Sequence, residues 1–404
     1  MTHIAWLGKK SPFCGNVTYG LTTTHALRQR GHGVSFIHFD TPAAGLARPF
    51  GDGAERQHQN HAHGPFRSGE SPEVALPYLV KSQVYTIPSP GAQRELRESL
   101  ERLRPDVVHA SLTLSPLDFR LPDLCQQLGL PLVATFHPPF DASLRNLTAG
   151  TQQLTYQLYA PSLARYDRVI VFSELQAEVL QRLGVPANRL AVIPNGVDTD
   201  LWQPAPAAES PELAELRQRF AGRRVFLYMG RVATEKNVEA LLKAWRLVRP
   251  AGCVLVVVGD GPLRTALQQA GGDEPDVVWW GYEPRLEMRV ALQQLAEVFL
   301  LPSLVEGLSL ALLEAMAAGT ACVATDAGAD GEVLEGGAGI VISTQGVTTQ
   351  LRTLLPVLRD QPLLTAELGR RGRRRALERY TLTGNIDALE ALYAGLVPQR
   401  SVAA

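Results

Sequence analysis

Short apolar runs alternate with amphipathic stretches along almost the whole chain. This alternation is the pattern of parallel strands joined by helices, so we predict an α/β fold. Several of the apolar runs lead directly into helix-like segments, for example residues 94–105. In the first half the predicted strands lie at 4–8, 34–39, 84–88, 106–111, 131–137, 167–173 and 190–196.

The alternation is interrupted at residues 198–212, where three prolines and several small residues follow one another. Such a stretch is typical of an interdomain linker. The alternation then restarts and predicts a second open α/β sheet, and residues 362–397 are predicted to be helical. The predicted strands of this half lie at 224–230, 253–259, 277–281, 298–303, 321–325 and 338–342.

The length of 404 residues exceeds what one hydrophobic core comfortably supports, and we predict two domains. Hydrophobic residues make up 45% and charged residues 20% of the chain, and the formal net charge is −1. This balance is that of an ordinary globular protein and indicates no nucleic-acid partner. The cysteines stand apart without a CxxC pair, which favours a reducing cytoplasm over a disulfide or zinc framework.

The chain shows no signal-peptide pattern, and no stretch approaches the ~20 apolar residues that cross a bilayer. We therefore expect a cytoplasmic protein whose contact with any membrane is peripheral. Residues 41–77 are rich in Gly, Pro and polar side chains and lack periodicity, which predicts a long mobile loop. The histidines of this loop, His58, His61 and His63, could imitate a metal cluster, but they are not assigned to a metal.

A glycine-rich turn joins the first predicted strand, which ends at Gly8, to a helix that begins near Val17. Amide groups at such a helix start could face a phosphate or a sugar hydroxyl, and a tight structural turn is an equal alternative. The turn matches neither GxGxxG nor the P-loop. His137 stands at the end of another predicted strand, where a ligand could approach, although a lone histidine is more often structural.

The second half contains a denser group of polar residues. Arg231 and Lys236 follow a predicted strand and precede a helix, and lysine occurs only five times in the chain. Two cations at the carboxyl end of a parallel strand match the charge of a diphosphate. The alternative is a solvated loop with ordinary surface charges. Gly259 and Gly261 flank a further strand-to-helix turn, for which a structural role and a ligand contact are equally plausible.

Residues 301–320 are the most informative segment. Ser309 is a plausible N-cap of a helix that runs from Leu310 to Ala318 and is closed by Gly319. The first amides of this helix would point at an anion. Glu306 precedes the helix and Glu314 lies on its second turn, where the carboxylates could bind sugar hydroxyls. An ordinary capped helix with a surface glutamate is the alternative. Asp198 and Asp200 form a DxD in the turn before the linker, to which we assign no metal.

Together these segments resemble glycosyltransferase family 4, whose members have the GT-B fold. The resemblance covers nearly the whole chain in order and spacing. It rests on GKKSPFCGN, RGHGVSFI, TFH, DRVIVFSE, IPNGVD, GRVATEKN, VGDGPL, WWGY, PSLVEGLSLALLEAMAAGTACVATDAGADGEV and the helical tail.

The resemblance implies two facing Rossmann-like domains and a retaining transfer that needs neither a metal ion nor a cofactor beyond the nucleotide-sugar donor. The expected domains are residues 1–200 on the acceptor side, 201–380 for the nucleotide sugar, and 381–404 as a helix that returns to the first domain. Residues 198–212 would link them and act as a hinge or spacer.

The resemblance also implies site residues. Arg231 and Lys236 would hold the diphosphate and stabilise the leaving group. Glu314 would bind the ribose hydroxyls, and Glu306 would lie against the transferred sugar. His137 would touch the 6-hydroxyl of that sugar or the phosphate. The implied catalytic set is Glu306, His137, Arg231 and Lys236, and the implied donor-binding set is Gly15, Asn16, Arg231, Lys236, Gly307, Leu308, Ser309, Leu310 and Glu314.

Two motifs depart from the family pattern. The paired glycines of the first loop appear as Gly15-Asn16, a mild change because Asn adopts left-handed conformations readily. The usual EGFGL appears as EGLSL at residues 306–310, which puts sugar selectivity in doubt.

Within the family the chain is similar to cyanobacterial lipid galactosyltransferases of the digalactosyldiacylglycerol synthase kind, through TLSPLDF, PLVATFHPPF, NLTAGTQQLTYQLYAP and SLVEGLSL. Residues 136–166 would suit an acceptor groove near a bilayer, or equally a buried helix. The arginines of 370–375 could favour anionic lipid, or could simply be a solvated helix face.

The leading hypothesis is a hexosyltransferase that galactosylates monogalactosyldiacylglycerol from UDP-galactose. The partners would be a nucleotide sugar (UDP-galactose or UDP-glucose) and a lipid or sugar acceptor. An alternative enzyme builds a polysaccharide or another glycoconjugate. An alternative from another class is a non-catalytic sugar-nucleotide sensor, against which Arg231, Lys236, Glu306 and Glu314 argue together.

Overall fold

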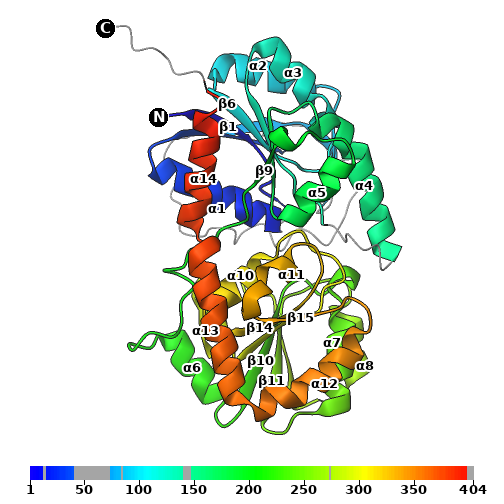
Figure 1. The fold of residues 1–404 in the computed structure, drawn as a ribbon, viewed down its shortest axis with the longest axis vertical. Helices are drawn as coiled ribbons and strands as arrows, with labels where there is room; N and C mark the ends of the chain where they lie inside the picture. The colour runs from blue at the N-terminus through cyan, green and yellow to red at the C-terminus, as the bar shows by residue number, and fades with distance from the viewer. Residues whose placement is uncertain (12–14, 41–72, 83–84, 140–146, 273, 398–404) are drawn as a thin grey trace, which may run out of the picture. The chain divides into compact units, whose positions relative to one another are not determined.

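The computed structural model describes residues 1–11, 15–40, 73–82, 85–139, 147–272 and 274–397 (Figure 1). By backbone proximity the chain divides into two compact units. The first comprises Met1–His137, Ser162–Ile170 and Leu389–Ala404, and the second comprises Pro138–Pro161 and Val171–Ala388. The predicted domain boundaries near residues 200 and 380, and the predicted hinge between them, stay predictions.

The first sheet has seven strands in the order β3-β2-β1-β6-β7-β8-β9. All the paired registers recorded in it are parallel, and Ile4 of the central strand pairs with Val34 on one side and Val107 on the other. The strands are β1 (His3–Leu7), β2 (Gly33–Phe39), β3 (Glu73–Leu76), β6 (Val107–Ser111), β7 (Leu132–Thr135), β8 (Arg168–Val171) and β9 (Leu190–Val192). The helices are α1 (Gly15–Gln29), α2 (Ala92–Leu103), α3 (Leu121–Leu128), α4 (Leu147–Leu163) and α5 (Glu174–Arg182).

Two predictions for this region were wrong. The loop predicted over 41–77 ends earlier, because Glu73–Leu76 forms the edge strand β3, with Val74 and Leu76 buried and their neighbours exposed. The alternation of buried and exposed residues covers only four positions and follows a polar segment, so the sequence pattern did not indicate a strand. The strand predicted at 84–88 is present as β5 (Thr86–Pro88), but it pairs antiparallel with β4 (Tyr78–Lys81) in a separate two-stranded sheet. Residues 41–72, with their histidines, lie outside the described residues.

The six strands predicted for the second half form one parallel sheet, in the order β12-β11-β10-β13-β14-β15. Counted from β10 this order is 3-2-1-4-5-6, the arrangement of a doubly wound nucleotide-binding sheet. The first sheet begins with the same order, counted from β1. The strands of the second sheet are β10 (Arg224–Met229), β11 (Cys253–Val258), β12 (Val277–Gly281), β13 (Val298–Leu301), β14 (Ala321–Thr325) and β15 (Ile340–Ile342).

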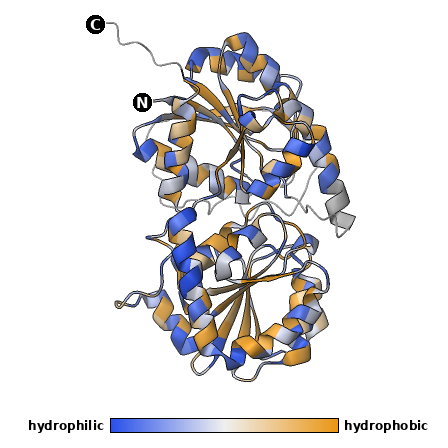
Figure 2. Ribbon diagram, in the orientation of Figure 1, coloured by the Kyte–Doolittle hydropathy of each residue, from blue (hydrophilic) through white to orange (hydrophobic). Residues whose placement is uncertain are grey.

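The second sheet is buried on both faces, because successive side chains of a strand point to opposite sides. Along β10, Leu227 belongs to one hydrophobic cluster and Phe226 and Tyr228 to the other. The first cluster is covered by α6 (Pro211–Arg219), α9 (Leu286–Leu295), α10 (Leu310–Ala317) and α13 (Pro362–Arg379), and the second by α7 (Val238–Val248) and α12 (Val347–Asp360). Figure 2 shows apolar strands in each sheet and helices of mixed polarity.

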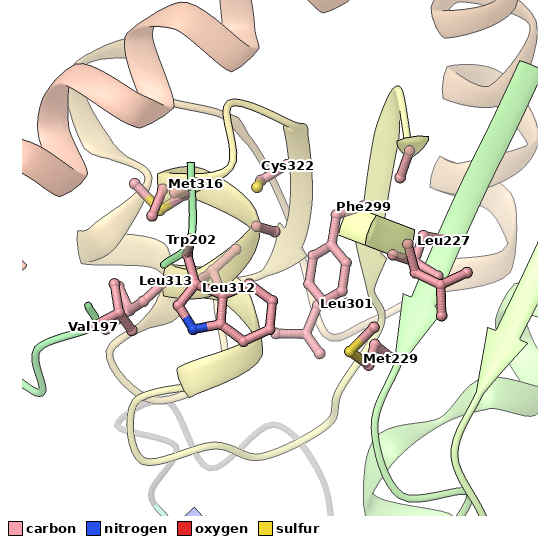
Figure 3. Packing of buried hydrophobic residues seen from close by; sticks show 14 of the residues in the cluster. Val197, Trp202, Leu227, Met229, Phe299, Leu301, Leu312, Leu313, Met316 and Cys322 are labelled. Carbon is pink, nitrogen blue, oxygen red and sulfur yellow. The ribbon is translucent and has the colours of Figure 1, made fainter. Parts of the chain in front are cut away.

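The stretch predicted as a linker contributes to this core. Trp202 is 4% exposed and packs with Leu312, Leu313 and Phe299 in the first hydrophobic cluster (Figure 3). Asp198 Oδ1 accepts hydrogen bonds from the amides of Asp200 and Leu201, so the carboxylate of this DxD caps its own turn. The segment is therefore anchored at Trp202 rather than loose throughout.

The predicted C-terminal helical tail is divided into α13 and α14 (Leu382–Ala394). Between them Thr381 forms a parallel bridge with Val197, and a Cβ on Gly196 would lie 2.4 Å from the Thr381 carbonyl oxygen. The end of α14 belongs to the first unit, where Glu390 pairs with Arg30 and His32. The end of α14 therefore lies in the first unit, as the predicted returning helix requires, and the strand orders of the two sheets are those of two Rossmann-like domains.

Candidate functional site

Each sheet contains a switch point, where the chain leaves two neighbouring strands in opposite directions. In the second sheet it lies between β10 and β13, because β10 is followed by β11 on one side and β13 by β14 on the other. Open α/β sheets bind ligands at this place, beyond the carboxyl ends of the strands. Arg231 follows β10 by two residues, and Glu306 follows β13 by five. The predicted site residues of the second half thus gather where the topology favours a ligand.

Lys236 and Glu306 form the centre of this group. The Lys236 Nζ atom donates to Glu306 Oε1 at 2.5 Å, and the Ser303 hydroxyl donates to the same oxygen at 2.7 Å. The Glu306 side chain is 9% exposed and that of Lys236 is 23% exposed. The backbone joins the two loops as well, since the Leu304 amide donates to the Glu235 carbonyl at 2.8 Å.

Arg231 is paired too, with the carboxylate of Glu235, but its side chain is 40% exposed. The two cations predicted to hold a diphosphate therefore each contact a carboxylate in the structure. An exposed pair of this kind contributes little to stability. A diphosphate that enters the site would have to compete with Glu235 and Glu306 for these cations.

Helix α10 begins at Leu310 as predicted and ends at Ala317, one residue before the predicted end. The Ser309 hydroxyl accepts from the Leu312 amide at 3.3 Å, which makes Ser309 the N-cap, and Gly319 follows the C-cap with φ +79°. The amides of Ser309, Leu310 and Ala311 were predicted to be free to face an anion, and for Ser309 this was wrong. This amide donates to Asp330 Oδ1 at 3.0 Å, so a carboxylate of the chain already uses part of the helix start.

Asp330 was missed by the sequence analysis. Its side chain is fully buried, and its Oδ2 atom has no hydrogen-bond partner among the described residues. Burial and then the neighbouring Glu306 carboxylate raise the pKa of Asp330 well above its usual range, while the Ser309 amide and Lys236 oppose this shift. Its place shortly after β14 was the one signal in the sequence, because carboxyl ends of strands carry ligand-binding residues.

Glycines hold the loop that carries Glu306 against its neighbours. Gly328 has φ +58°, and a Cβ there would lie 2.1 Å from the Glu306 carbonyl oxygen. The next residue, Ala329, donates its amide to the Gly307 carbonyl at 2.8 Å. At the turn after β11, a Cβ on Gly259 would lie 1.9 Å from the Gly230 carbonyl oxygen. Close packing against Gly230 therefore explains why a glycine stands at position 259, which favours the structural role over the ligand contact.

Glu314 lies on the second turn of α10 and is half-buried. Desolvation raises its pKa to about 7, and Arg289 on α9 works against the shift. A carboxyl with this pKa exchanges its proton near neutral pH. It can therefore donate a hydrogen bond when neutral and accept hydrogen bonds from hydroxyl groups when ionised.

The loop residues Gly307, Leu308 and Leu310 differ in what they expose. The Leu308 side chain is 7% exposed and packs in the hydrophobic cluster, and Leu310 packs against that cluster. The loop can therefore offer a ligand its backbone at Leu308 rather than this side chain. The assignment of these residues to donor binding stays a prediction.

In the first sheet the switch point lies between β1 and β6. Gly15 and Asn16 open α1, which follows β1, and Ser111 ends β6. His137 follows the neighbouring β7, and its Nε2 atom lies 2.8 Å from the Ser111 hydroxyl. That hydroxyl donates to Asn16 Oδ1 at 2.7 Å. The structure thus brings Asn16 and His137 together through a serine that the sequence analysis missed.

The imidazole of His137 is kept neutral by its surroundings. Desolvation, assisted by the charge of Lys9, lowers its pKa to about 3. The Tyr19 ring packs edge-on against it with ring centroids 5.0 Å apart. At neutral pH, His137 therefore acts through hydrogen bonds and not as a cation.

The arginines at residues 370–375 of α13 make two kinds of contact, hydrogen bonds to backbone carbonyls and ion pairs on their own helix. Arg375 donates to the carbonyls of Val333 and Glu332, and Arg373 donates to the last turn of α10 at Ala317. Such contacts satisfy carbonyl groups at a helix C-terminus. Arg370 and Arg371 both pair with Glu367 on their own helix. The arginines therefore include structural members and do not form a uniform cationic surface.

Among the described residues, no group of three or more His, Cys, Asp and Glu side chains is placed to hold a metal ion. Metal independence stays a prediction. In the same part of the chain, no helix combines the length and the apolar character that crossing a bilayer requires.

Comparison with known proteins matches both halves of the chain. Residues 15–201 match the family described as Glycosyltransferase Family 4, and residues 223–360 match the one described as Glycosyl transferases group 1. The alpha-maltose-1-phosphate synthase of Mycolicibacterium smegmatis is 29% identical over 294 residues, which cover 68% of this chain and 75% of that protein. The MMP alpha-(1->4)-mannosyltransferase of Mycolicibacterium hassiacum is 31% identical over 269 residues, 62% of each chain.

A solved structure supports the fold. The crystal structure of Anabaena Alr3699/HepE in complex with UDP-glucose has a TM-score of 0.73 at 18% identity, covering 98% of this chain and 100% of that one. Two doubly wound sheets, each with polar residues at its switch point, together with these matches define a glycosyltransferase of the GT-B fold. The chain is accordingly a hexosyltransferase.

Proposed function

We propose that the chain transfers a hexosyl group from a UDP-hexose to an acceptor hydroxyl, with retention of anomeric configuration and without a metal ion. The observation that carries this proposal is the Lys236–Glu306 pair at the switch point of the second sheet, beside the start of α10. Structures of the similar HepE contain UDP, UDP-glucose, or UDP and glucose, which supports a uridine nucleotide as the donor.

The charges suggest how the donor enters. A diphosphate carries two negative charges and would replace Glu306 as the partner of Lys236, with Arg231 as a second cation. Glu306 would then be released to accept hydrogen bonds from the hydroxyls of the sugar. Glu314, one turn into α10, would accept from the ribose. Stabilising the leaving diphosphate by fixed cations lowers the barrier for breaking its bond to the sugar.

UDP release with different donors tests the nature of the donor. The purified protein should hydrolyse or transfer UDP-glucose or UDP-galactose faster than GDP-mannose, measured as nucleoside diphosphate released. The sugar preference reports on residues 306–310, where the chain departs from the family pattern. Absence of binding to every UDP-hexose, measured by calorimetry on the folded protein, would remove the proposed donor site.

For the acceptor we propose a membrane glycolipid, with monogalactosyldiacylglycerol as the first compound to test. The motif resemblance to lipid galactosyltransferases supports it, as do the exposed apolar side chains of Leu79 and Val80 on β4. Incubation with UDP-galactose should give the digalactosyl lipid. Turnover with soluble sugar acceptors and none with lipid would favour the second candidate, synthesis of another glycoconjugate, which the maltose-1-phosphate synthase relative supports.

Replacing Lys236 by Ala should lower kcat/KM at least tenfold, a barrier increase of ~1.4 kcal/mol. The physical reason is the loss of a fixed cation beside the leaving diphosphate. Initial rates of UDP release with the preferred donor measure the effect. Lys243→Ala is the matched control, because Lys243 lies exposed on α7 away from Glu306.

Equal rates for the two lysine variants would exclude the phosphate role of Lys236. The sugar-nucleotide sensor would be favoured by a different result. In that case the native chain and the Lys236 variant would bind UDP-hexose equally well, and neither would turn it over with any acceptor. The pairing of Lys236 with a nearly buried Glu306 argues for the enzyme.

A further inference from the structure

A buried carboxyl group that the proposed function does not use lies at the start of α10. Asp330 follows β14 by five residues, and its Oδ1 atom accepts the Ser309 amide at 3.0 Å. The side chain is 0% exposed. Its Oδ2 atom is buried as well and has no hydrogen-bond partner within the described ranges of the chain. The two oxygens of Asp330 therefore have unequal surroundings.

The charges around Asp330 do not balance a second carboxylate. The titratable groups that face it are Glu306 from the loop before α10, Lys236 from the loop after β10, and the Cys322 thiol of β14. Lys236 already donates to Glu306, and the Cys322 thiol donates to the Thr320 carbonyl. An ionised Asp330 would place two buried carboxylates beside one cation. An uncompensated buried charge of this kind is relieved by taking up a proton.

We propose that Asp330 is a positioning residue of the loop before α10 and acts as a neutral carboxylic acid that carries its proton on Oδ2. The unprotonated Oδ1 then accepts the Ser309 amide, and the side chain adds no negative charge to that of Glu306. Burial and the Glu306 carboxylate both raise the pKa of Asp330, in agreement with the neutral form.

The neutral form matters for the nucleotide sugar, and this step rests on the proposed function. At the start of α10 the Ser309 hydroxyl accepts the Leu312 amide, and Asp330 accepts the Ser309 amide. The amides of Leu310 and Ala311 lie between them, at the positive end of the helix. A fixed negative charge on Asp330 would oppose a diphosphate at these amides, whereas a neutral acid holds the loop without repelling it.

The pH dependence of unfolding tests the protonation state without any turnover. Asp330→Asn reproduces the neutral acid, with an oxygen for the Ser309 amide and a donor in place of the Oδ2 hydroxyl, but it binds no proton. A native chain with neutral Asp330 takes up a proton on folding at any pH above the ordinary pKa of 3.8. Its unfolding equilibrium constant should therefore rise about tenfold more per pH unit than that of the variant, between pH 5 and pH 7.

Urea denaturation of both proteins at each pH, followed by tryptophan fluorescence, gives these constants. Glu314 titrates in both proteins, so its contribution cancels in the comparison. Parallel pH profiles of the native chain and Asp330→Asn would show that Asp330 is ionised in the folded protein and would overturn the neutral acid.

Donor binding tests the positioning role. Asp330→Ala releases the Ser309 amide and should weaken the affinity for UDP-glucose at least tenfold, measured by calorimetry at pH 7. Asp330→Asn keeps both the hydrogen bond and the neutral charge and should retain the native affinity within threefold. The matched control is Asp326→Ala, which removes another carboxylate after β14 that accepts a backbone amide at 3.0 Å, that of Thr344. Asp330→Val, similar in size but without an acceptor, replaces Asp330→Ala if that chain does not fold.

The two measurements separate the possible failures. Equal losses of affinity in Asp330→Ala and Asp326→Ala would indicate general damage after β14 and would reject the positioning role. Binding of UDP-glucose at least tenfold more tightly by Asp330→Asn than by the native chain would reveal a charge on Asp330 and reject the neutral form. The expected unfolding profiles in a protein that binds no UDP-hexose would overturn the proposed function and leave the neutral Asp330 intact.

Discussion

At the scale of single residues, burial decides how the carboxylates of the second unit behave. Glu306 is nearly buried and has Lys236 and Ser303 as partners. Asp330 is fully buried and accepts a hydrogen bond from the Ser309 backbone amide, and burial raises its pKa well above the usual range. Glu314 is half-buried and titrates near neutral pH. These acidic side chains, close in sequence, are thus desolvated and compensated differently, and burial raises the pKa of Asp330 and of Glu314.

The raised pKa of Glu314 predicts a dependence of stability on pH. Folding raises this pKa from 4.5 to about 7, so the folded chain holds the proton more tightly than the unfolded chain. The stability associated with the protonated form is therefore present below pH 4.5 and is lost as pH rises through 7. Glu314→Gln should reduce this decline, visible in thermal midpoints between pH 5 and pH 8.

The same residue predicts a dependence of donor binding on pH, if ionised Glu314 accepts from the ribose. Calorimetry should show tighter binding of UDP-glucose at pH 8 than at pH 6, and a flat profile in Glu314→Gln. Glu287→Gln removes an exposed carboxylate from α9 and serves as the control. Identical pH profiles in the native protein and both variants would contradict the role assigned to Glu314.

At the scale of elements, the loop before α10 is positioned by backbone hydrogen bonds together with the Asp330 side chain. Within the loop, the Leu304 amide donates to the Glu235 carbonyl, and the Gly307 carbonyl accepts from the Ala329 amide. These two hydrogen bonds connect the loop to the segments on either side. Asp330 accepts from Ser309 at its far end. Loops that contact a ligand through their backbone need such support, since amide donors are effective only when held in place.

Gly328 provides a test of this support. Gly328→Ala combines a left-handed φ of +58° with a Cβ 2.1 Å from the Glu306 carbonyl oxygen, so the loop must shift. We expect at least a tenfold weaker affinity for UDP-glucose, measured by calorimetry. Gly346→Ala is matched in φ, at +68°, but its Cβ would meet nothing within 4 Å.

The control variant should therefore carry only the backbone strain of roughly 1–2 kcal/mol. Urea denaturation of the two variants compares these costs. If Gly328→Ala binds the donor like Gly346→Ala, the loop tolerates displacement, and its close packing is unrelated to the site.

At the scale of the whole molecule, two sheets with the same initial strand order each create a switch point with polar residues. The C-terminal part of the chain completes the first unit by a buried contact. The Tyr393 hydroxyl of α14 lies 2.5 Å from His109 Nδ1, and His109 Nε2 lies 2.7 Å from the Thr135 hydroxyl. Trp6 packs on the same imidazole, with ring centroids 4.1 Å apart.

Tyr393→Phe should therefore destabilise the first unit by about 1–3 kcal/mol, because the fully buried His109 loses the partner of its Nδ1 atom. Chemical denaturation followed by the fluorescence of tryptophan, with Trp6 next to His109, measures the loss. Tyr282→Phe, at a side chain that is 55% exposed, is the control. Equal stability of both variants would show that α14 is held by its surface ion pairs instead.

Much of the fold could be predicted because it depends on local pattern. The six strands of the second sheet were found from their apolar runs, and the limits of α10 from Ser309 and Gly319. The failures share a cause. β3 is four residues long, and β5 pairs with a strand that the pattern did not suggest. Short edge segments are specified by their partners more than by their own composition.

The sequence predicted which residues belong to the candidate site, but it did not predict the hydrogen bonds that connect them. Arg231, Lys236, Glu306 and Glu314 were found by type and position, whereas Ser111 and Asp330 were missed. Ser111 bonds with Asn16 across 95 positions of sequence, and Asp330 with Ser309 across 21. No spacing rule connects such residues, because the sheet order brings them together.

The sequence by itself determined the alternation of strands and helices, the caps of α10, and the supply of cations and carboxylates after particular strands. These properties depend on neighbours within a few residues. Only the tertiary structure decided that Lys236 meets Glu306, that Asp330 takes the Ser309 amide, and that Ser111 bonds with both Asn16 and His137. The physical reason is that hydrogen bonding and desolvation depend on distance in space, which the packing of distant segments sets.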